Sequence, residues 1–515
     1  MRSFRVRSGG GSRRGRRGRP GAHLPTFVLL AAVLVTTALL AGAAPAVGQD
    51  SGAEARPEGD PSPRATLRLD YFHTGGKGDE IFAIDRVVVE PLPWPGHPAG
   101  DVDPSGHGPY RFEVRDLAGG LLYSRGFGSI YGEWATTAEA RQRHHTFHES
   151  LRFPAPASPV EVVLSHRDDD NHLREVWRVV VDPEDMYVDP SPPPEHPVID
   201  VEVHGPPAEK VDLLLLGDGY TAEECEGKFA ADARRMAEAL FAVEPFASRR
   251  GDFNVRGLCP PSPEPGVSRP STGRHVRSPL GATYDVFGSE RYVLTYDNRR
   301  WRDVAAWAPY EFVTLLVNAE TYGGGGLYNL YSTVAVDSDW ADYLFVHEFG
   351  HHFAALADEY YTSAVAYEAP ERVIEPWEPN VTALLDPEAL KWADLVSPAT
   401  PLPTPWPKQA FEEAARGYGE RRRDIRAREL PESHMSELFR EERDEETALL
   451  SAAAHAGHVG AFQGANYDAR SYYRPQVDCV MFTRNRVPFC AVCSRAVEAV
   501  IDLHTLGGEP AGASP

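Results

Sequence analysis

Two histidines and a glutamate in residues 346–353 have the spacing of a metal-dependent hydrolase. His347, Glu348 and His351 form the pattern H-E-x-x-H. Residues four apart on a helix lie about 40° apart around its axis, so both imidazoles can bind one ion. Zinc lowers the pKa of a bound water to around 7, and Glu348 could accept its proton as general base. The pattern predicts one catalytic Zn²⁺ ion and the hydrolysis of peptide bonds.

A catalytic zinc site needs a third protein ligand, and the candidates are Asp358 and Glu359. On a continued helix Asp358 would share the histidine face but lie roughly 10 Å along the axis from His351. The helix must therefore end and the chain must turn back. Metzincins turn at a glycine and bind with a third histidine, but this chain has Ala354 and Ala357 at those positions. We favour Asp358, with Glu359 as the alternative; a more distant glutamate, or a structural role for both, stays open.

A methionine further along the chain offers a second indication of a metzincin-like site. Met481 lies in the segment 478–482, and metzincins place a methionine-containing turn beneath the zinc. We expect Met481 to occupy such a turn, and an ordinary buried methionine is the alternative. Tyr472 and Tyr473, just before it, could polarise a carbonyl oxygen but more often serve as packing residues.

Three of the five cysteines lie near this methionine. Cys490 and Cys493 have the C-x-x-C spacing of a zinc-ligand pair or of a redox motif. No second C-x-x-C accompanies them. We therefore favour a disulfide between Cys479 and one member of this pair, with one thiol left over.

Two predicted domains must position these residues. About seven short β-rich runs between residues 66 and 181, without convincing helices, predict an all-β sandwich domain over residues 65–183. A proline-rich linker follows at 184–197. Alternating strands and helices then predict an α/β catalytic domain over 198–507. Together with the H-E-x-x-H pattern and Met481, this predicts a zinc peptidase domain, a zincin of metzincin-like type with a mixed sheet and an active-site helix. Residues 50–64 form a flexible lead-in, and 508–515 form a tail.

Within the second domain, the sequence predicts the secondary structure of three segments most clearly. The continuous apolar run at 211–216 predicts a strand that is buried on both faces. Thr221 and Glu224 fit a capping box at the start of a single helix that continues to Leu240. Residues 342–357 predict the helix that carries the H-E-x-x-H pattern, with an apolar side for the core.

The N-terminus and the overall charge bear on location and partners. Residues 1–49 contain eight arginines, then an apolar run and small residues, which predicts an export signal; an uncleaved membrane anchor is the alternative. We expect a secreted or extracytoplasmic protein. The net charge of −23 argues against nucleic acid or an anionic membrane surface as partner. No G-x-S-x-G, P-loop or dinucleotide pattern occurs.

Residues 347–361 resemble the active-site helix of the IgA-specific zinc metalloendopeptidase family. Three other segments are also similar to that family: residues 216–221, residues 323–328 and the segment from Cys479 to Cys493. The resemblance covers about residues 66–505. It implies a zinc peptidase fold, one zinc bound by His347, His351 and Asp358, and Glu348 as catalytic residue. It does not imply that the substrate is IgA, and Ala355 replaces a frequent glycine of the family.

The sequence therefore predicts an extracytoplasmic zinc endopeptidase that acts on protein or peptide substrates. Two alternatives remain open. One is a binding or adhesion protein with an inactive zincin domain, and the other is a metal hydrolase of the cell-wall amidase type. The intact Glu348 speaks against the first. The sequence does not determine the oligomeric state.

Overall fold

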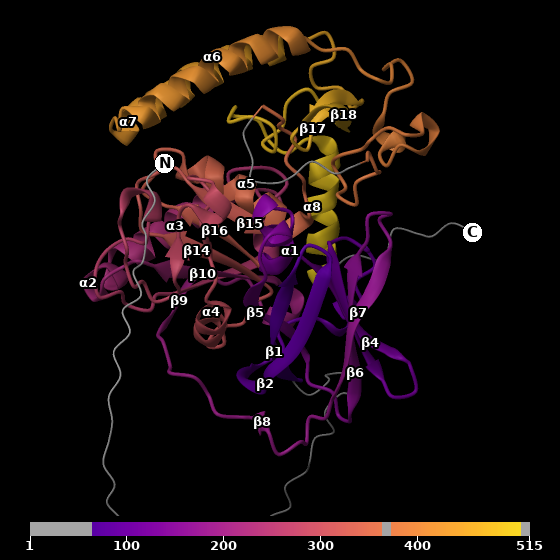
Figure 1. Ribbon diagram of the computed structural model, residues 1–515, viewed down its shortest axis with the longest axis vertical. Coiled ribbons are helices and arrows are strands. Elements are labelled where there is room, and N and C mark those ends of the chain that lie inside the picture. Colours follow the sequence, from indigo (N-terminus) through magenta and orange to yellow (C-terminus); the bar gives the residue numbers. More distant parts are fainter. Residues whose placement is uncertain (1–63, 363–371, 506–515) are drawn as a thin grey trace, which may run out of the picture. The chain divides into compact units, whose positions relative to one another are not determined.

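The computed structural model describes residues 64–362 and 372–505, and its N-terminal part consists of two four-stranded sheets (Figure 1). Their strand orders are β5-β1-β2-β8 and β4-β3-β6-β7. All neighbouring strands pair antiparallel except β2 and β8. The strands are β1 (Ala65–Gly76), β2 (Asp79–Pro93), β3 (Tyr110–Asp116), β4 (Leu121–Phe127), β5 (His145–Pro154), β6 (Val160–Arg167), β7 (Leu173–Val181) and β8 (Val188–Asp189).

Alternating burial along the strands builds the core between these two sheets. Tyr110, Phe112 and Val114 are the buried positions of β3, at the period of two that strand geometry requires. Leu67 and Leu69 of β1, in the other sheet, join the same cluster. The chain therefore has the predicted N-terminal β domain followed by a region of mixed α and β structure.

A buried histidine lies beside this core. His73 of β1 has its Nδ1 3.0 Å from Glu149 and its Nε2 3.2 Å from Glu80, and its ring stacks on Tyr131 of α1 (Ile130–Ala135). Burial alone would lower the pKa of His73, but the two carboxylates raise it. Burial likewise opposes ionisation of Glu80, yet hydrogen bonds from His166 and His73 lower its pKa to about 2. The three groups form a charged network.

The proline-rich segment between the domains is partly structured. β8 lies within the predicted linker 184–197 and pairs in parallel with β2, through Val87 with Val188 and Val88 with Asp189. Part of the linker therefore extends the first sheet.

The second region is built on a six-stranded sheet with the order β15-β16-β14-β10-β11-β9. Every residue of β10 is buried, as its apolar run predicts, because parallel neighbours flank it on both sides and layers cover both faces. β15 pairs antiparallel at one end of the sheet. The strands are β9 (Val198–Glu202), β10 (Val211–Asp218), β11 (Phe253–Leu258), β14 (Phe312–Val317), β15 (Gly324–Leu327) and β16 (Tyr331–Ala335).

The helix predicted after Thr221 is two helices in the structure. The capping box of Thr221 and Glu224 is present and starts α2 (Ala222–Glu226). Gly227 then adopts φ −124° and ψ −68°, outside the helical range, before α3 (Lys228–Leu240) begins. Phe229 and Met236 lie on the buried side of α3 as predicted. The glycine, which is weakly helix-forming, separates the two segments.

The remaining helices and small sheets complete the second region. The helices are α4 (Asn298–Ala305), α5 (Ala341–Ala354), α6 (Lys408–Ala427), α7 (Glu432–Ser451) and α8 (Ala491–His504). Two-stranded sheets pair β12 (Ala282–Thr283) with β13 (Leu294–Thr295) and β17 (Phe462–Ala465) with β18 (Asp468–Arg474). Short 3-10 helices lie at Pro98–Gly100, Ala138–Arg141, Pro207–Glu209, Arg250–Asp252, Pro270–Thr272, Val286–Gly288, Pro387–Ala389 and Ala393–Leu395.

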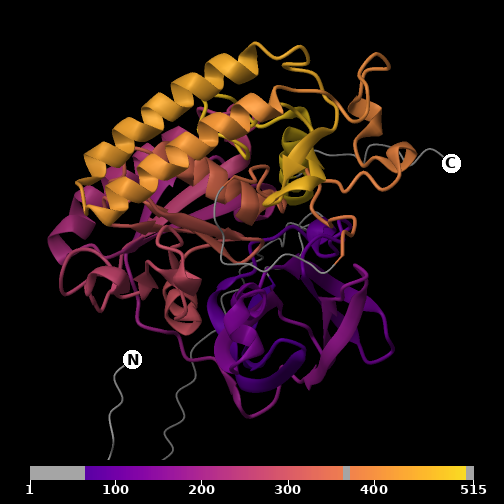
Figure 2. The same cartoon turned by 45° about the horizontal axis from the view of Figure 1, so that its top comes forward.

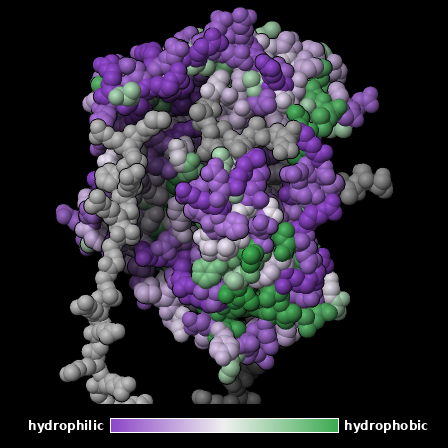
Figure 3. Space-filling model, viewed as in Figure 1, coloured by the Kyte–Doolittle hydropathy of each residue, from purple (hydrophilic) through white to green (hydrophobic). Residues whose placement is uncertain are grey.

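Helices α6 and α7 run side by side (Figure 2). They carry the charged segment of the sequence, and ion pairs such as Arg421 with Glu441 (2.6 Å) connect them. On the face drawn in Figure 3 this pair is hydrophilic, whereas hydrophobic residues gather over the N-terminal β domain. Among the described residues, no helix combines the length and the hydrophobicity that a bilayer crossing requires. Residues 1–49, with the predicted export signal, lie outside the described residues.

Buried contacts connect the β domain to the second region. Arg68 of β1 is almost wholly buried, and its guanidinium lies 2.5 Å from Asp303 of α4 as well as 2.9 Å from Asp70. Arg152 of β5 donates to the backbone carbonyl of Tyr310 at 2.8 Å. A buried cation that lost such partners would be costly, so these contacts hold the two regions together.

Candidate metal centre

Helix α5 presents His347 and His351 on one side, one turn apart. The opposite side of the helix, with Phe345, Phe349 and Phe353, is buried in the main hydrophobic cluster. α5 packs on β15 and β16 and contacts α3 and α8. The apolar side anchors the helix in the core and directs the two imidazoles toward the cleft.

Helix α5 ends at Ala354, before the two carboxylates that were considered as third ligand. Ala355 caps α5 in the left-handed conformation, with φ 57° and ψ 28°. The chain then turns back and brings Asp358 to the histidines. Its Oδ1 lies 3.0 Å from Nε2 of His347 and 3.2 Å from Nε2 of His351. Glu359, the alternative candidate, points to a different cluster, described below.

The three side chains fit a tetrahedral metal ion. The Nε2 atoms of His347 and His351 lie 3.2 Å apart. Two nitrogens that bind zinc at 2.0–2.1 Å in a tetrahedral site are separated by about 3.3 Å. Nδ1–H of His347 donates to the carbonyl of Val480 at 3.0 Å, and Nδ1–H of His351 donates to that of Leu356 at 2.5 Å. These bonds leave both Nε2 lone pairs directed at the shared centre.

Asp358 is held as a carboxylate. Burial opposes its ionisation, but His351 and His347 hold its pKa well below the usual range. Its second oxygen accepts a short hydrogen bond from the hydroxyl of Tyr467. Tyr467 follows β17 and is more than 100 residues away in sequence, so no spacing pattern could have connected it to the helix motif.

Met481 lies directly against α5. Its side chain is fully buried, and its Sδ is 2.9 Å from where a Cβ on Gly350 would stand. Its backbone carbonyl accepts from the N–H of Glu359 at 2.9 Å. The neighbouring Val480 carbonyl is the one that orients His347. The segment thus packs against the buried side of α5, and the assignment of Met481 to a Met-turn stays a prediction.

Glu348 lines the same cleft as the three metal-binding candidates. It is half-buried, and burial raises the pKa of its carboxyl against the opposing effect of the two histidines. A Cβ on Gly324 of β15 would stand 3.0 Å from its Cγ. The carboxyl therefore lies between the helix and the strand at the sheet end, beside the imidazoles that share its helix.

A cleft of about 500 Å³ opens over these residues. Arg291 and Tyr360 also line it, and the guanidinium of Arg291 donates to the hydroxyl of Tyr360 at 3.3 Å. Of the two tyrosines considered from sequence, Tyr472 lines the cleft. Arg291 belongs to a loop without a recognisable motif, so sequence reasoning missed it.

The cysteines differ from the expectation. The structure forms a disulfide between Cys225 and Cys259, which joins α2 to the residue after β11. Cys479, Cys490 and Cys493 are free and buried, so the disulfide predicted for Cys479 is absent. The Sγ atoms of Cys479 and Cys493 are 3.9 Å apart, well beyond the bond length of about 2.05 Å. The physical reason is that all three thiols surround the carboxylate of Glu359.

Two family models match the sequence of this chain. The sequence model of the family described as IgA Peptidase M64 matches residues 199–501, and that of the Peptidase M64 N-terminus matches residues 60–178. A search of curated proteins finds no match. The two matched regions cover most of the chain, and the first includes the helix, the turn and the cysteine segment. The chain therefore belongs to the IgA peptidase M64 family and is a peptidase, with proteins or peptides as its class of substrate.

Proposed function

We propose that this chain is a zinc-dependent endopeptidase of zincin fold, with His347, His351 and Asp358 as the zinc ligands. The observation that carries the proposal is the convergence of two imidazole nitrogens and one carboxylate oxygen within 3.2 Å of one another. This donor set is typical of catalytic zinc, which keeps a fourth position open for water or substrate.

Zinc in this centre supplies a Lewis acid that polarises the scissile carbonyl and makes water a nucleophile near neutral pH. Glu348 accepts the proton of the attacking water and passes it to the leaving amine. Its raised pKa suits a group that must hold the proton between these two steps. Arg291 and Tyr360 place hydrogen-bond donors in the same cleft, where they can stabilise negative charge that develops on the substrate.

The end of the sheet offers one position for an extended peptide. Most backbone groups on the outer side of β15 already have hydrogen-bond partners. The N–H of Gly324 donates to the carbonyl of Arg291, and its carbonyl accepts from the N–H of Val293. The carbonyl of Tyr328 accepts from the N–H of Gly128. Gly326 lies between them. A Cβ there would stand 2.3 Å from the carbonyl of Glu348, so only glycine permits this approach of strand and helix. Strand addition by the substrate is therefore limited to about one residue pair.

The proposal includes action outside the cytoplasm. The residues that predict export are 1–49, and the disulfide between Cys225 and Cys259 supports the same location, because disulfides persist in oxidising compartments. N-terminal sequencing of the protein recovered from culture medium or membranes distinguishes a cleaved signal from an anchor. Recovery of reduced protein from the cytoplasm would contradict the proposed location.

The decisive test is Glu348→Gln, compared with the parent and with Glu413→Gln, an exposed glutamate of α6. Loss of general acid–base catalysis should reduce turnover of a protein or a quenched-fluorescence peptide library by about 10²–10⁴-fold, with the zinc content unchanged. The Glu413 variant should behave as the parent. Turnover retained in Glu348→Gln would refute the mechanism.

The same assay, with peptidoglycan added as a second substrate, separates the two alternatives. A binding protein with an inactive domain would contain zinc and cleave nothing in the library. A cell-wall amidase would release muropeptides from peptidoglycan and leave proteins intact.

A further inference from the structure

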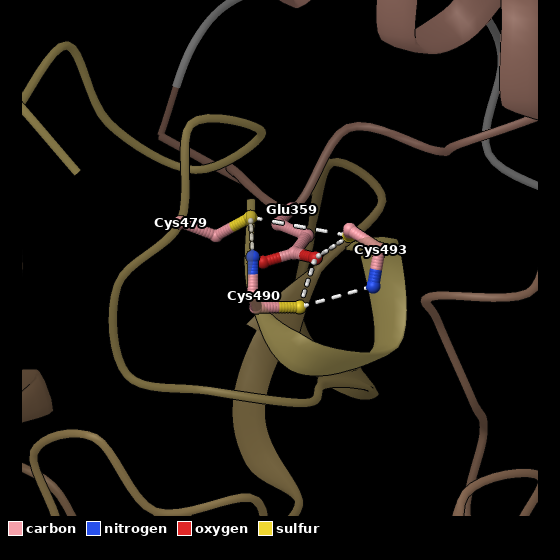
Figure 4. Close-up of side chains that lie close together, drawn as sticks. All are labelled: Glu359, Cys479, Cys490 and Cys493. Carbon is pink, nitrogen blue, oxygen red and sulfur yellow. Dashed lines mark hydrogen bonds between the residues drawn. The ribbon is translucent and has the colours of Figure 1, made fainter. Parts of the chain in front are cut away.

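Next to the proposed catalytic centre lies a second group of metal-binding side chains. Cys479, Cys490, Cys493 and Glu359 each direct one donor atom to a common point, and these atoms all lie within 4.8 Å of one another (Figure 4). All four residues are buried. From this geometry we propose a second, structural zinc site with three thiolates and one carboxylate as ligands.

The distances fit a metal better than a disulfide. Sγ of Cys493 is 3.2 Å from Oε1 of Glu359, Sγ of Cys490 is 3.9 Å from it, and the Sγ atoms of Cys479 and Cys493 are 3.9 Å apart. Sulfurs that bind zinc at about 2.3 Å in a tetrahedral site are separated by about 3.8 Å. The cluster already has nearly this spacing.

The buried carboxylate lacks a partner that a cation would supply. Oε1 of Glu359 accepts from the side-chain amide of Asn380 at 3.0 Å, whereas Oε2 is buried without a hydrogen-bond partner among the described residues. Arg474 exerts an attraction on Glu359, but its guanidinium donates to backbone carbonyls such as that of Gly464 at 2.8 Å. An unsatisfied buried carboxylate is costly, and a bound divalent cation removes that cost.

The backbone places N–H donors against two of the three sulfurs. Cys490 caps α8 and Cys493 lies in its first turn, where the helix dipole stabilises negative charge. The N–H of Cys490 donates to Sγ of Cys479 at 3.2 Å, and that of Cys493 to Sγ of Cys490 at 3.4 Å. Such N–H donors to sulfur are the outer contacts that support thiolate ligands of a metal.

The second site would connect three parts of the catalytic region. Glu359 directly follows Asp358, Cys479 lies two residues before Met481, and the other two cysteines begin α8. Zinc there would tie the chain leaving α5 to the turn beneath it and to α8. It would also protect three thiols from oxidation in an exported protein.

The test is zinc stoichiometry of the purified, folded chain, measured by elemental analysis. The parent should contain two zinc ions per chain, the His347→Ala variant one, and the Cys490→Ser/Cys493→Ser variant one. Replacing Cys225 and Cys259 by serine is the matched control and should leave two. Because the two sites are removed separately, failure of this proposal is distinguishable from failure of the proposed catalytic centre.

Two further measurements apply if the cysteine variant does not fold. Cobalt substituted into the His347→Ala variant should show a thiolate-to-cobalt charge-transfer band, which nitrogen and oxygen ligands do not produce. Thiol titration of the unfolded parent should find three thiols. One zinc in the parent that disappears in His347→Ala, or a single titratable thiol in the parent, would overturn the proposal.

Discussion

Replacing Gly350 of α5 by alanine should weaken metal binding although it removes no ligand. The new Cβ would stand 2.9 Å from Sδ of Met481, 3.1 Å from Phe489 and 3.4 Å from Leu356. Met481 is fully buried and the other two nearly so, hence none of them can move into solvent. The Met481 side chain, or the turn that carries it, must therefore shift.

The size of the effect follows from what this turn holds. The carbonyl of Val480 orients His347, and loss of such a contact costs about 10–100-fold in metal affinity, or about 1.4–2.7 kcal/mol. Overpacking costs about 1–3 kcal/mol of stability, but alanine regains up to about 1 kcal/mol over glycine in a helix. Metal affinity is therefore a sharper readout than unfolding.

The assay is competition for zinc with a chromophoric chelator. The matched control is Gly417→Ala in α6, where a Cβ meets nothing within 4 Å. The control should bind zinc as the parent does, and Gly350→Ala should bind it 10–100-fold more weakly. Equal affinity of the two variants would refute the reasoning that the turn supports the site.

Three other changes have expected outcomes. Ala355 adopts the left-handed conformation, which costs an alanine about 1–2 kcal/mol, so Ala355→Gly should raise the unfolding temperature. Ala354→Gly, inside α5, should lower it, because glycine is unfavourable in a helix. The reverse order of unfolding temperatures would exclude backbone strain at the helix end. Because the pKa of His73 is raised in the folded state, the stabilisation from its charged form is complete below the unfolded pKa of about 6.5 and is lost as pH rises through the folded pKa. The protection of β1 amides from hydrogen exchange, corrected for intrinsic exchange rates, should therefore fall with rising pH in the parent. It should not change with pH in His73→Gln. Replacing Cys225 and Cys259 by alanine opens a loop spanning 34 positions and should cost about 3–4 kcal/mol; an unchanged denaturation midpoint would contradict this.

Local patterns in the sequence were sufficient for several elements. The apolar run of β10 is buried throughout, because a strand flanked and covered on all sides tolerates no polar face. The capping box at Thr221 forms as predicted, since its two hydrogen bonds connect residues only three apart. The single helix expected after it was wrong at Gly227, where one glycine divides it in two.

The cysteines show where such reasoning ends. Spacing identified Cys490 and Cys493 as a pair, but their pairing with Cys479 as a disulfide was wrong. The structure places Glu359 among the three thiols, a contact between residues more than 100 positions apart. The C-x-x-C pattern does not predict that a carboxylate from a distant turn lies beside the thiols.

The sequence by itself determined the chemistry of the main site: a helix whose spacing places His347 and His351 on one side, with Glu348 between them. It also limited the third ligand to residues beyond the helix end. Only the tertiary structure shows which carboxylate lies beside the histidines: after the left-handed Ala355 the chain turns back, Asp358 lies next to His347 and His351, and Glu359 lies among the three cysteines. Helical periodicity is local and can be read from a few residues, whereas the direction of the chain after a helix depends on what the core packs against it.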